Sequence, residues 1–206
     1  MLRLAGTIGG VALLAGIALG VTGRVSDHLG PDAALLFALG GPWFVVAFAV
    51  GAAARSPVAG AIGGAVALAV SVAVYYALML AIERRGGQAY AMSMTLLWGG
   101  AAVPCGVLFG AAGGLWRGRR DDLRAAGLAL LGGALGGEAL LFLARGGASS
   151  SGWVLPCELL GGIALVLSAS RTAPRLPVTI GTTAAAFSAS AGGALRLLMR
   201  AQGWGG

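Results

Sequence analysis

Residues 42–55 read PWFVVAFAVGAAAR, an uncharged run that opens on a proline and closes on an arginine. The same layout recurs at Pro104…Arg117 and at Pro156…Arg171, each time with apolar sequence on both sides. Recurring apolar segments bounded by charge are typical of repeated membrane hairpins. The pattern therefore predicts an integral membrane protein built from a repeated pair of helices.

The composition supports a membrane location. The 206 residues are 58% hydrophobic and only 10% charged, with a mean hydropathy of +0.88, whereas about a quarter of the residues in a soluble domain are charged. Charge-free windows cover 4–23, 33–54, 56–82 and 86–116, and a helix needs about 20 residues to cross the hydrocarbon. Lipid cannot satisfy an open sheet edge, and a β-barrel would show alternation. We expect an all-α, polytopic membrane helical bundle.

Seven spans are expected, at about 4–22, 33–54, 57–81, 91–115, 123–144, 152–170 and 176–198. They predict a single domain, with one N-terminal helix and three parallel hairpins at about 31–87, 88–146 and 147–206. Gly and Ala are so common here that chance similarity between the hairpins is the competing interpretation. The N-terminal run could also be a signal peptide, but it is longer than a usual signal core, so we expect a retained helix.

The charge distribution predicts orientation and partners. All fourteen cationic side chains are arginine, which with the Gly-rich and Ala-rich composition indicates a bacterial coding bias. By loop parity, eight arginines share the side of the N-terminus and six lie opposite, which favours a cytoplasmic N-terminus in a bacterial plasma membrane. The net charge of +7 is explained by attraction to lipid headgroups. We therefore expect the lipid bilayer as a partner and no nucleic acid.

Glycines at four-residue spacing predict close helix packing, because small residues let helix backbones approach. The pairs and triplet are Gly6/Gly10, Gly16/Gly20, Gly60/Gly64, Gly106/Gly110/Gly114 and Gly133/Gly137. They are expected to pack helices within one chain, a dimer motif being the alternative.

Two carboxylates are the candidate functional side chains. Glu138 lies well inside the fifth predicted span and Glu158 near the start of the sixth. A charge in the membrane interior costs about 3 kcal/mol unless it is neutralised, paired or hydrated. The functional interpretation is a substrate or proton-coupling site, and the structural one is a buried ion pair or a hydrogen-bonded neutral acid. Arg196 and Arg200 could supply the pair or simply reach the headgroups.

The repeated prolines are candidates for the same site. Pro42, Pro104 and Pro156 would each remove a helix hydrogen bond and kink the chain, and interrupted spans at matching positions point to a transporter's binding site. Kinks that serve only packing are the alternative.

The residues that often carry catalysis or bind metals are poorly placed here. Cys105 and Cys157 follow two of the prolines and are expected to act as small apolar residues. His28, the single histidine, lies in a loop, and one histidine makes no metal site. The sequence also lacks a P-loop and a dinucleotide fingerprint. We expect neither enzyme activity nor a cofactor or metal.

Two parts of the sequence resemble known families. GPWFVVAFAVG at 41–51, continuing to RRGG at 84–87, resembles small actinobacterial integral membrane proteins grouped as a family of unknown function, which implies no activity. PCGVLFGAAGG at 104–114 is similar to a span in the substrate-capturing subunits of energy-coupling-factor vitamin transporters, which usually have six spans. An acidic residue that often follows that run is replaced here by Trp116 and Arg117.

The sequence thus favours a small-solute transporter or a membrane-embedded substrate-binding subunit, whose substrate sits where the second, fourth and sixth spans meet Glu138. The alternative is a non-catalytic partner or scaffold subunit of a larger membrane complex. The first predicts a polar pocket at mid-membrane that contains Glu138. The second predicts a dry bundle with a broad groove of small residues facing the lipid.

Overall fold

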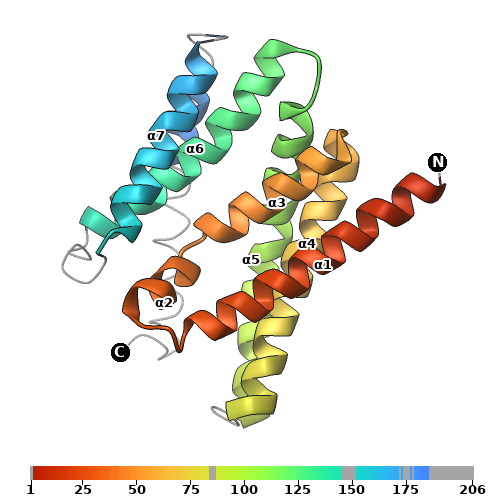
Figure 1. Ribbon diagram of the computed structural model, residues 1–206, viewed down its shortest axis with the longest axis vertical. Coiled ribbons are helices and arrows are strands. Elements are labelled where there is room, and N and C mark those ends of the chain that lie inside the picture. Colours follow the sequence, from red (N-terminus) through yellow and green to blue (C-terminus); the bar gives the residue numbers. More distant parts are fainter. Residues whose placement is uncertain are drawn as a thin grey trace.

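The computed structural model of the chain describes residues 2–83, 87–144, 152–171, 173, 177 and 179–185. Regular structure in these residues is entirely helical (Figure 1). The elements are α1 (Leu2–Ser26), α2 (Pro31–Ala38), α3 (Gly41–Ala54), α4 (Pro57–Leu78), the π-helical η1 (Met79–Glu83), α5 (Gly87–Trp116), α6 (Asp121–Ala144) and α7 (Val154–Ser170). A bundle of this kind satisfies its backbone hydrogen bonds internally, as lipid requires.

Four of these helices are long and apolar enough to cross a membrane: α1, α4 with η1, α5 and α6. If the bent pair α2–α3 counts as one span, the number of candidate membrane spans in the described residues rises to five. The apolar α7, at 17 residues, is shorter than these. The expected seventh span, 176–198, lies mostly outside the described residues, as do Arg196 and Arg200. Several apolar helices support a multi-pass membrane protein, while the number seven stays a prediction.

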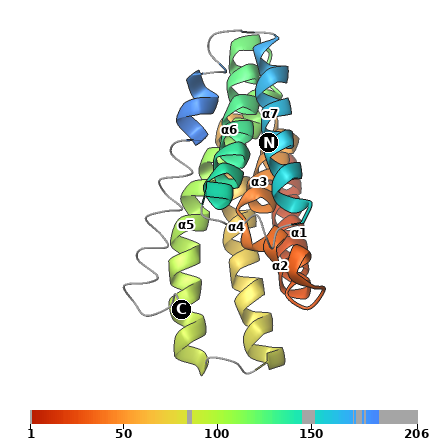
Figure 2. The same cartoon turned by 90° about the vertical axis from the view of Figure 1, so that its left-hand side faces the viewer.

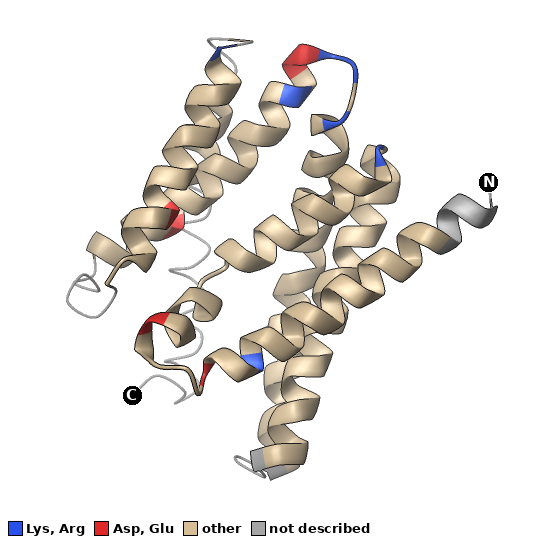
Figure 3. Cartoon of the chain, in the orientation of Figure 1, with Lys and Arg blue, Asp and Glu red and all other residues tan. Residues whose placement is uncertain are grey.

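Most charged side chains of the described residues lie at or near helix ends (Figure 3). Arg55 ends α3, and Arg117, Arg119, Arg120 and Arg124 lie in or beside the turn between α5 and α6. Long uncharged stretches separate them, as expected for helices whose middles lie in hydrocarbon. The cytoplasmic position of the N-terminus, which sets the bilayer side of this arginine-rich end, stays a prediction.

Helices α4 and α5 run side by side in both views (Figures 1 and 2) and pack through glycine. A Cβ on Gly64 would collide with the carbonyl oxygen of Gly106, and one on Gly110 with that of Gly60. No other residue allows this backbone approach, and in lipid such contact supplies much of the attraction between helices. The predicted packing role of these glycines is confirmed.

Other predicted glycine faces have the same role. Gly16 and Gly20 of α1 leave no room for a Cβ against α4, and Gly133 meets the backbone of Gly181. Gly10 is the exception among the predicted glycines whose surroundings the structure describes, because nothing lies within 4 Å of a Cβ placed there. The surroundings of Gly6 lie outside that part of the structure. The packing role expected for Gly10 is therefore wrong.

The main apolar core joins α1, α3, α4, α5 and α6. Its largest members include Phe48 of α3, Leu68 of α4, Phe109 of α5 and Leu135 of α6. Helix α7 adds a second layer by packing on α6 (Figure 1). The division into one helix and three hairpins stays a prediction, because the last expected hairpin is only partly described.

Candidate functional site

The second predicted span is broken in two. Helices α2 and α3 meet at an angle of 54°, and the break falls at Leu39-Gly40, directly before Gly41-Pro42. A proline ring clashes with the carbonyl four residues earlier, so a helix cannot run undisturbed through this point. Leu39 is accordingly extended, with ψ at 155°.

Pro42 therefore acts differently from the internal kink that the sequence suggested. It occupies the first turn of α3, where its missing N–H costs nothing. Pro156 likewise lies in the first turn of α7, and only Pro104 lies inside a helix, α5. Pro104 and Pro156 are exposed on the described surface. Pro42 and Pro156 thus lie at helix starts and Pro104 within a helix, so the three do not form one matching set of interrupted spans.

The break exposes backbone groups, and nearby residues satisfy several of them. The Trp43 indole Nε1–H donates to the carbonyl oxygen of Phe37 at 3.0 Å. The Phe44 N–H donates to the Gly40 carbonyl oxygen at 2.9 Å and starts the hydrogen bonding of α3. The Gly40 N–H itself donates to Oε1 of Glu138 on α6 at 2.8 Å. Glu138 therefore accepts a hydrogen bond from the backbone at the break between α2 and α3.

Glu158 of α7 reaches the same break. A Cβ on Gly41 would collide with Oε1 of Glu158, so the carboxyl group lies directly against the start of α3. Both carboxyl oxygens of Glu158 are buried, and within the described chain neither has a hydrogen-bond partner. Glu138 and Glu158 are also close enough to interact electrostatically. The structure thus brings together the two carboxylates that the sequence singled out.

The surroundings of the pair are apolar and come from several helices. Leu135 of α6 lies beside Gly41, and the rings of Phe44 and Phe109 stack with centroids 4.4 Å apart. Cys105 of α5 lies within electrostatic range of Glu138. Cys105 and Cys157 are both free thiols. Carboxyl groups in such surroundings are poorly solvated, and their charge state responds strongly to any ion or donor that arrives.

Two hollows on the surface are apolar and contain neither carboxylate. One, of about 390 Å³, lies between α1 and the broken span and is lined in part by Leu19, Phe37 and Pro42. The other, of about 590 Å³, lies along α4 and α5. Neither is the polar pocket at Glu138 that the transporter hypothesis predicted.

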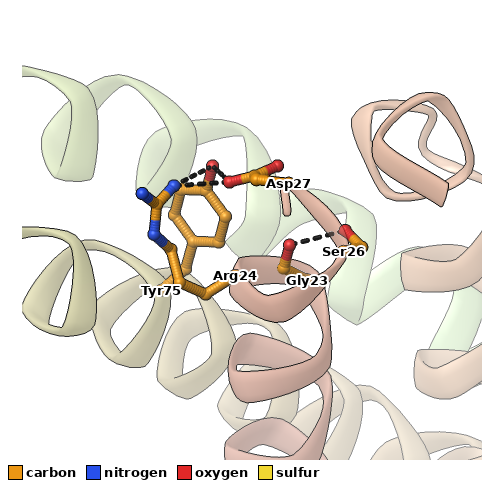
Figure 4. A network of polar contacts seen from close by, with 5 residues as sticks. All are labelled: Gly23, Arg24, Ser26, Asp27 and Tyr75. Carbon is orange, nitrogen blue, oxygen red and sulfur yellow. Dashed lines mark hydrogen bonds and ion pairs between the residues drawn. The ribbon is translucent and has the colours of Figure 1, made fainter. Parts of the chain in front are cut away.

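A polar network that sequence reasoning missed joins the end of α1 to α4 (Figure 4). Arg24 Nη1 pairs with Oδ2 of Asp27 at 2.5 Å and donates to the Tyr75 hydroxyl at 3.4 Å. That hydroxyl donates to the same Asp27 oxygen at 2.7 Å. The three-residue spacing of Arg24 and Asp27 is a local signal that the sequence carries. Nothing in the sequence indicated that Tyr75, 51 residues from Arg24, completes the network.

Within the described residues, no three or more His, Cys, Asp or Glu side chains are grouped so that they could hold a metal ion. The candidate site therefore consists of a broken span and two buried carboxyl groups, in a multi-pass helical membrane protein.

The chain matches DUF6518, a family of unknown function, over residues 2–200, and therefore belongs to that family. This confirms the expected membership of a family of unknown function. The actinobacterial origin and the likeness to energy-coupling-factor transporters stay predictions. No curated protein and no solved structure matches the chain.

Proposed function

We propose that this protein is a non-enzymatic, proton-coupled transporter or substrate-binding subunit for a small solute in a bacterial plasma membrane. The observation that carries the proposal is the meeting of Glu138 and Glu158 at the start of α3. Carboxyl groups from two other helices face the break at which a span changes direction.

A broken span supports a ligand site on general grounds. Irregular backbone at membrane depth is tolerated only where protein buries it or where it lines a cavity. The first turn of a helix leaves backbone N–H groups unpaired and carries a partial positive charge. Many secondary transporters bind substrates and coupling ions at such half-helix ends. Here Gly40 already uses one N–H to hold a carboxylate.

Glu158 supports coupling to protons. Its carboxyl oxygens are buried without a hydrogen-bond partner among the described residues, and a charge in the membrane interior costs about 3 kcal/mol. Gain or loss of the Glu158 proton therefore changes the free energy of keeping this side chain buried. A change of that size is enough to shift an equilibrium between two conformations of the protein. Glu138 close by makes two charges at once still less favourable.

The packing supports a mechanism in which helix pairs move. Glycines fix α4 against α5 through direct backbone contact, and α7 packs mainly on α6. The broken span connects the two pairs, because α3 packs on α4 and α5 while its first residues contact Glu138 and Glu158. Rocking of α6–α7 against α4–α5 would open and close the space between the carboxylates and α3.

The test uses the full chain reconstituted in phosphatidylcholine vesicles that contain a pH-sensitive dye. Amines, amino acids and vitamins are added outside, and proton movement is recorded under an imposed pH gradient. We expect one solute class to move protons in the wild type, and Glu158→Gln and Glu138→Gln to abolish that movement. Asp122→Asn, in an exposed ion pair at the other end of α6, is the matched control. Solute-driven proton movement that survives both glutamate variants contradicts the proposal.

The alternative is a scaffold subunit of a membrane complex, and one observation favours it. The two surface hollows described above are apolar, and neither contains a carboxylate. If the protein is a scaffold, a mild detergent extract should contain it in a stable stoichiometric complex, and no solute should drive proton movement. Glu158→Gln should change neither result. A complex that persists while the proton assay stays silent would favour this function over transport.

A further inference from the structure

We infer that the outer face of α4 and α5 holds one anionic glycerophospholipid, with its acyl chain in the apolar groove and its phosphate at Arg55 and Arg117. The groove, of about 590 Å³, is lined by α4 from Pro57 to Val66 and by Val107 and Ala111 of α5. This site is separate from the carboxylate pair, and it stands or falls independently of the proposed transport.

The length of the groove fits one leaflet of a bilayer. From Pro57 to Val66 a helix rises about 14 Å, and half of the hydrocarbon core is about 15 Å thick. The groove begins two residues after Arg55, at the arginine-rich end of the bundle. Trp116 lies at the same end, with the Arg117 guanidinium carbon 5.8 Å from its ring centroid. Tryptophan and arginine typically mark the headgroup level, so the groove runs from that level toward mid-membrane.

The charges at its mouth suit a phosphate. In the turn after α5, Arg120 pairs with Asp122 at 2.7 Å and Arg124 with Asp121 at 3.5 Å. The hydrogen bond from Arg120 holds the pKa of Asp122 below its usual value, so that pair is charged at neutral pH.

Arg55 and Arg117 are exposed and, in the part of the chain that the structure describes, belong to no ion pair. Gly114, three residues before Arg117, packs on Ser56 and Pro57 beside Arg55, so the chain segments that carry the two arginines lie against each other. A guanidinium group can bind two oxygens of a phosphate at once.

The walls of the groove favour an acyl chain over a partner helix. Val58 and Ile62 stand 71% and 62% exposed on its rim, and Ala61 and Ala65 line it between them. Glycine gives the closest backbone contact between helices in lipid. The glycines of this pair that could provide it already hold α4 against α5. A flexible chain can follow a groove walled by branched side chains.

The test places the purified full chain in nanodiscs of equimolar phosphatidylglycerol and phosphatidylcholine, releases it into mild detergent, and counts retained lipids by native mass spectrometry. We expect the wild type to retain phosphatidylglycerol preferentially. Arg55→Gln with Arg117→Gln should lower that retention by about fivefold for each arginine removed, and Ala61→Phe should lower it by filling the groove. Arg124→Gln and Leu167→Phe, on α6 and the exposed face of α7, are the matched controls.

Three results overturn the inference. The first is equal retention of the two lipids by the wild type, and the second is the same loss in the controls as in the groove variants. The third is that Ala61→Phe dissociates a dimer of the chain or releases a protein partner, which would make the groove a protein interface. The arginine variants are at the exposed surface, so they test the headgroup contact even if Ala61→Phe impairs folding.

Discussion

The backbone N–H of Gly40 donates a hydrogen bond to Oε1 of Glu138 across 98 residues of sequence, at 2.8 Å. This bond ties the break between α2 and α3 to helix α6. It also gives Glu138 a structural role beside the functional one proposed. The two roles can be separated, because one depends on an acceptor oxygen and the other on a titratable group.

Glu138→Ala should destabilise the protein more than Glu138→Gln. Alanine leaves the half-buried Gly40 N–H without this acceptor, which costs about 1 kcal/mol, the low end of the range for a buried donor, whereas the glutamine carbonyl can still accept the bond. The free energy of unfolding in mixed detergent–SDS micelles measures the difference. Equal losses for the two variants would show that the Gly40 bond contributes nothing to stability.

Gly41→Ala should impair transport with little loss of stability. The added Cβ collides with the end of the Glu158 side chain, which is flexible and can turn away at a cost of about 1 kcal/mol. The carboxyl group then no longer lies against the start of α3. Solute-driven proton movement should fall sharply while the unfolding midpoint stays close to that of the wild type.

Gly161→Ala is the matched control for Gly41→Ala, since nothing lies within 4 Å of a Cβ at Gly161, one turn along α7 from Glu158. It should change neither transport nor stability. If Gly41→Ala transports normally, the position of Glu158 at the break is irrelevant to function.

The sequence predicted the helical membrane class and both carboxylates for physical reasons that act locally. Apolar length determines which segments can span a bilayer, and an isolated carboxylate in such a segment is conspicuous because of its cost. The meeting of Glu138 and Glu158 is not local, because it depends on how α6 and α7 pack against α3. The same limit hid Tyr75 from prediction.

The proline pattern shows a different limit. Proline predicted a disturbed helix at residue 42, and the disturbance is present. Whether the chain kinks or starts a new helix depends on the flanking residues. Here Leu39 is extended, and Gly40 and Gly41 leave the space that the side chains of Phe44 and Glu158 occupy. At Pro104 the helix continues past the proline. Proline alone therefore locates the irregularity without specifying its form.

Gly51→Ala should destabilise the bundle strongly. A Cβ at this position in α3 collides with the carbonyl oxygen of Gly110 in α5, a backbone atom that cannot rotate away. Forced separation of packed helices costs about 1–3 kcal/mol, occasionally more. Gly99→Ala on α5 has nothing within 4 Å of its Cβ and should be neutral or slightly stabilising. Thermal unfolding of both variants in the same detergent tests the packing, and equal midpoints would contradict it.

Tyr75→Phe should loosen the attachment of α1 to α4 (Figure 4). The substitution keeps the ring and removes the hydroxyl that donates to Asp27 at 2.7 Å. A hydrogen bond to a charged group contributes about 1.5–3 kcal/mol, and the partial exposure of this one places the expected loss at the low end. Unfolding in mixed micelles measures the loss, and hydrogen exchange at the α1–α2 turn should quicken.

Tyr76→Phe provides the internal control for this network. The two rings touch edge to face with centroids 5.1 Å apart, so each substitution removes one hydroxyl from a pair of neighbouring rings and leaves the ring packing intact. Only the Tyr75 hydroxyl takes part in the Arg24–Asp27 network. Tyr76→Phe should therefore leave exchange at the α1–α2 turn unchanged. If the two variants behave alike, the network does not fasten α1, and the apolar contacts of α1 with α4 alone hold it in place.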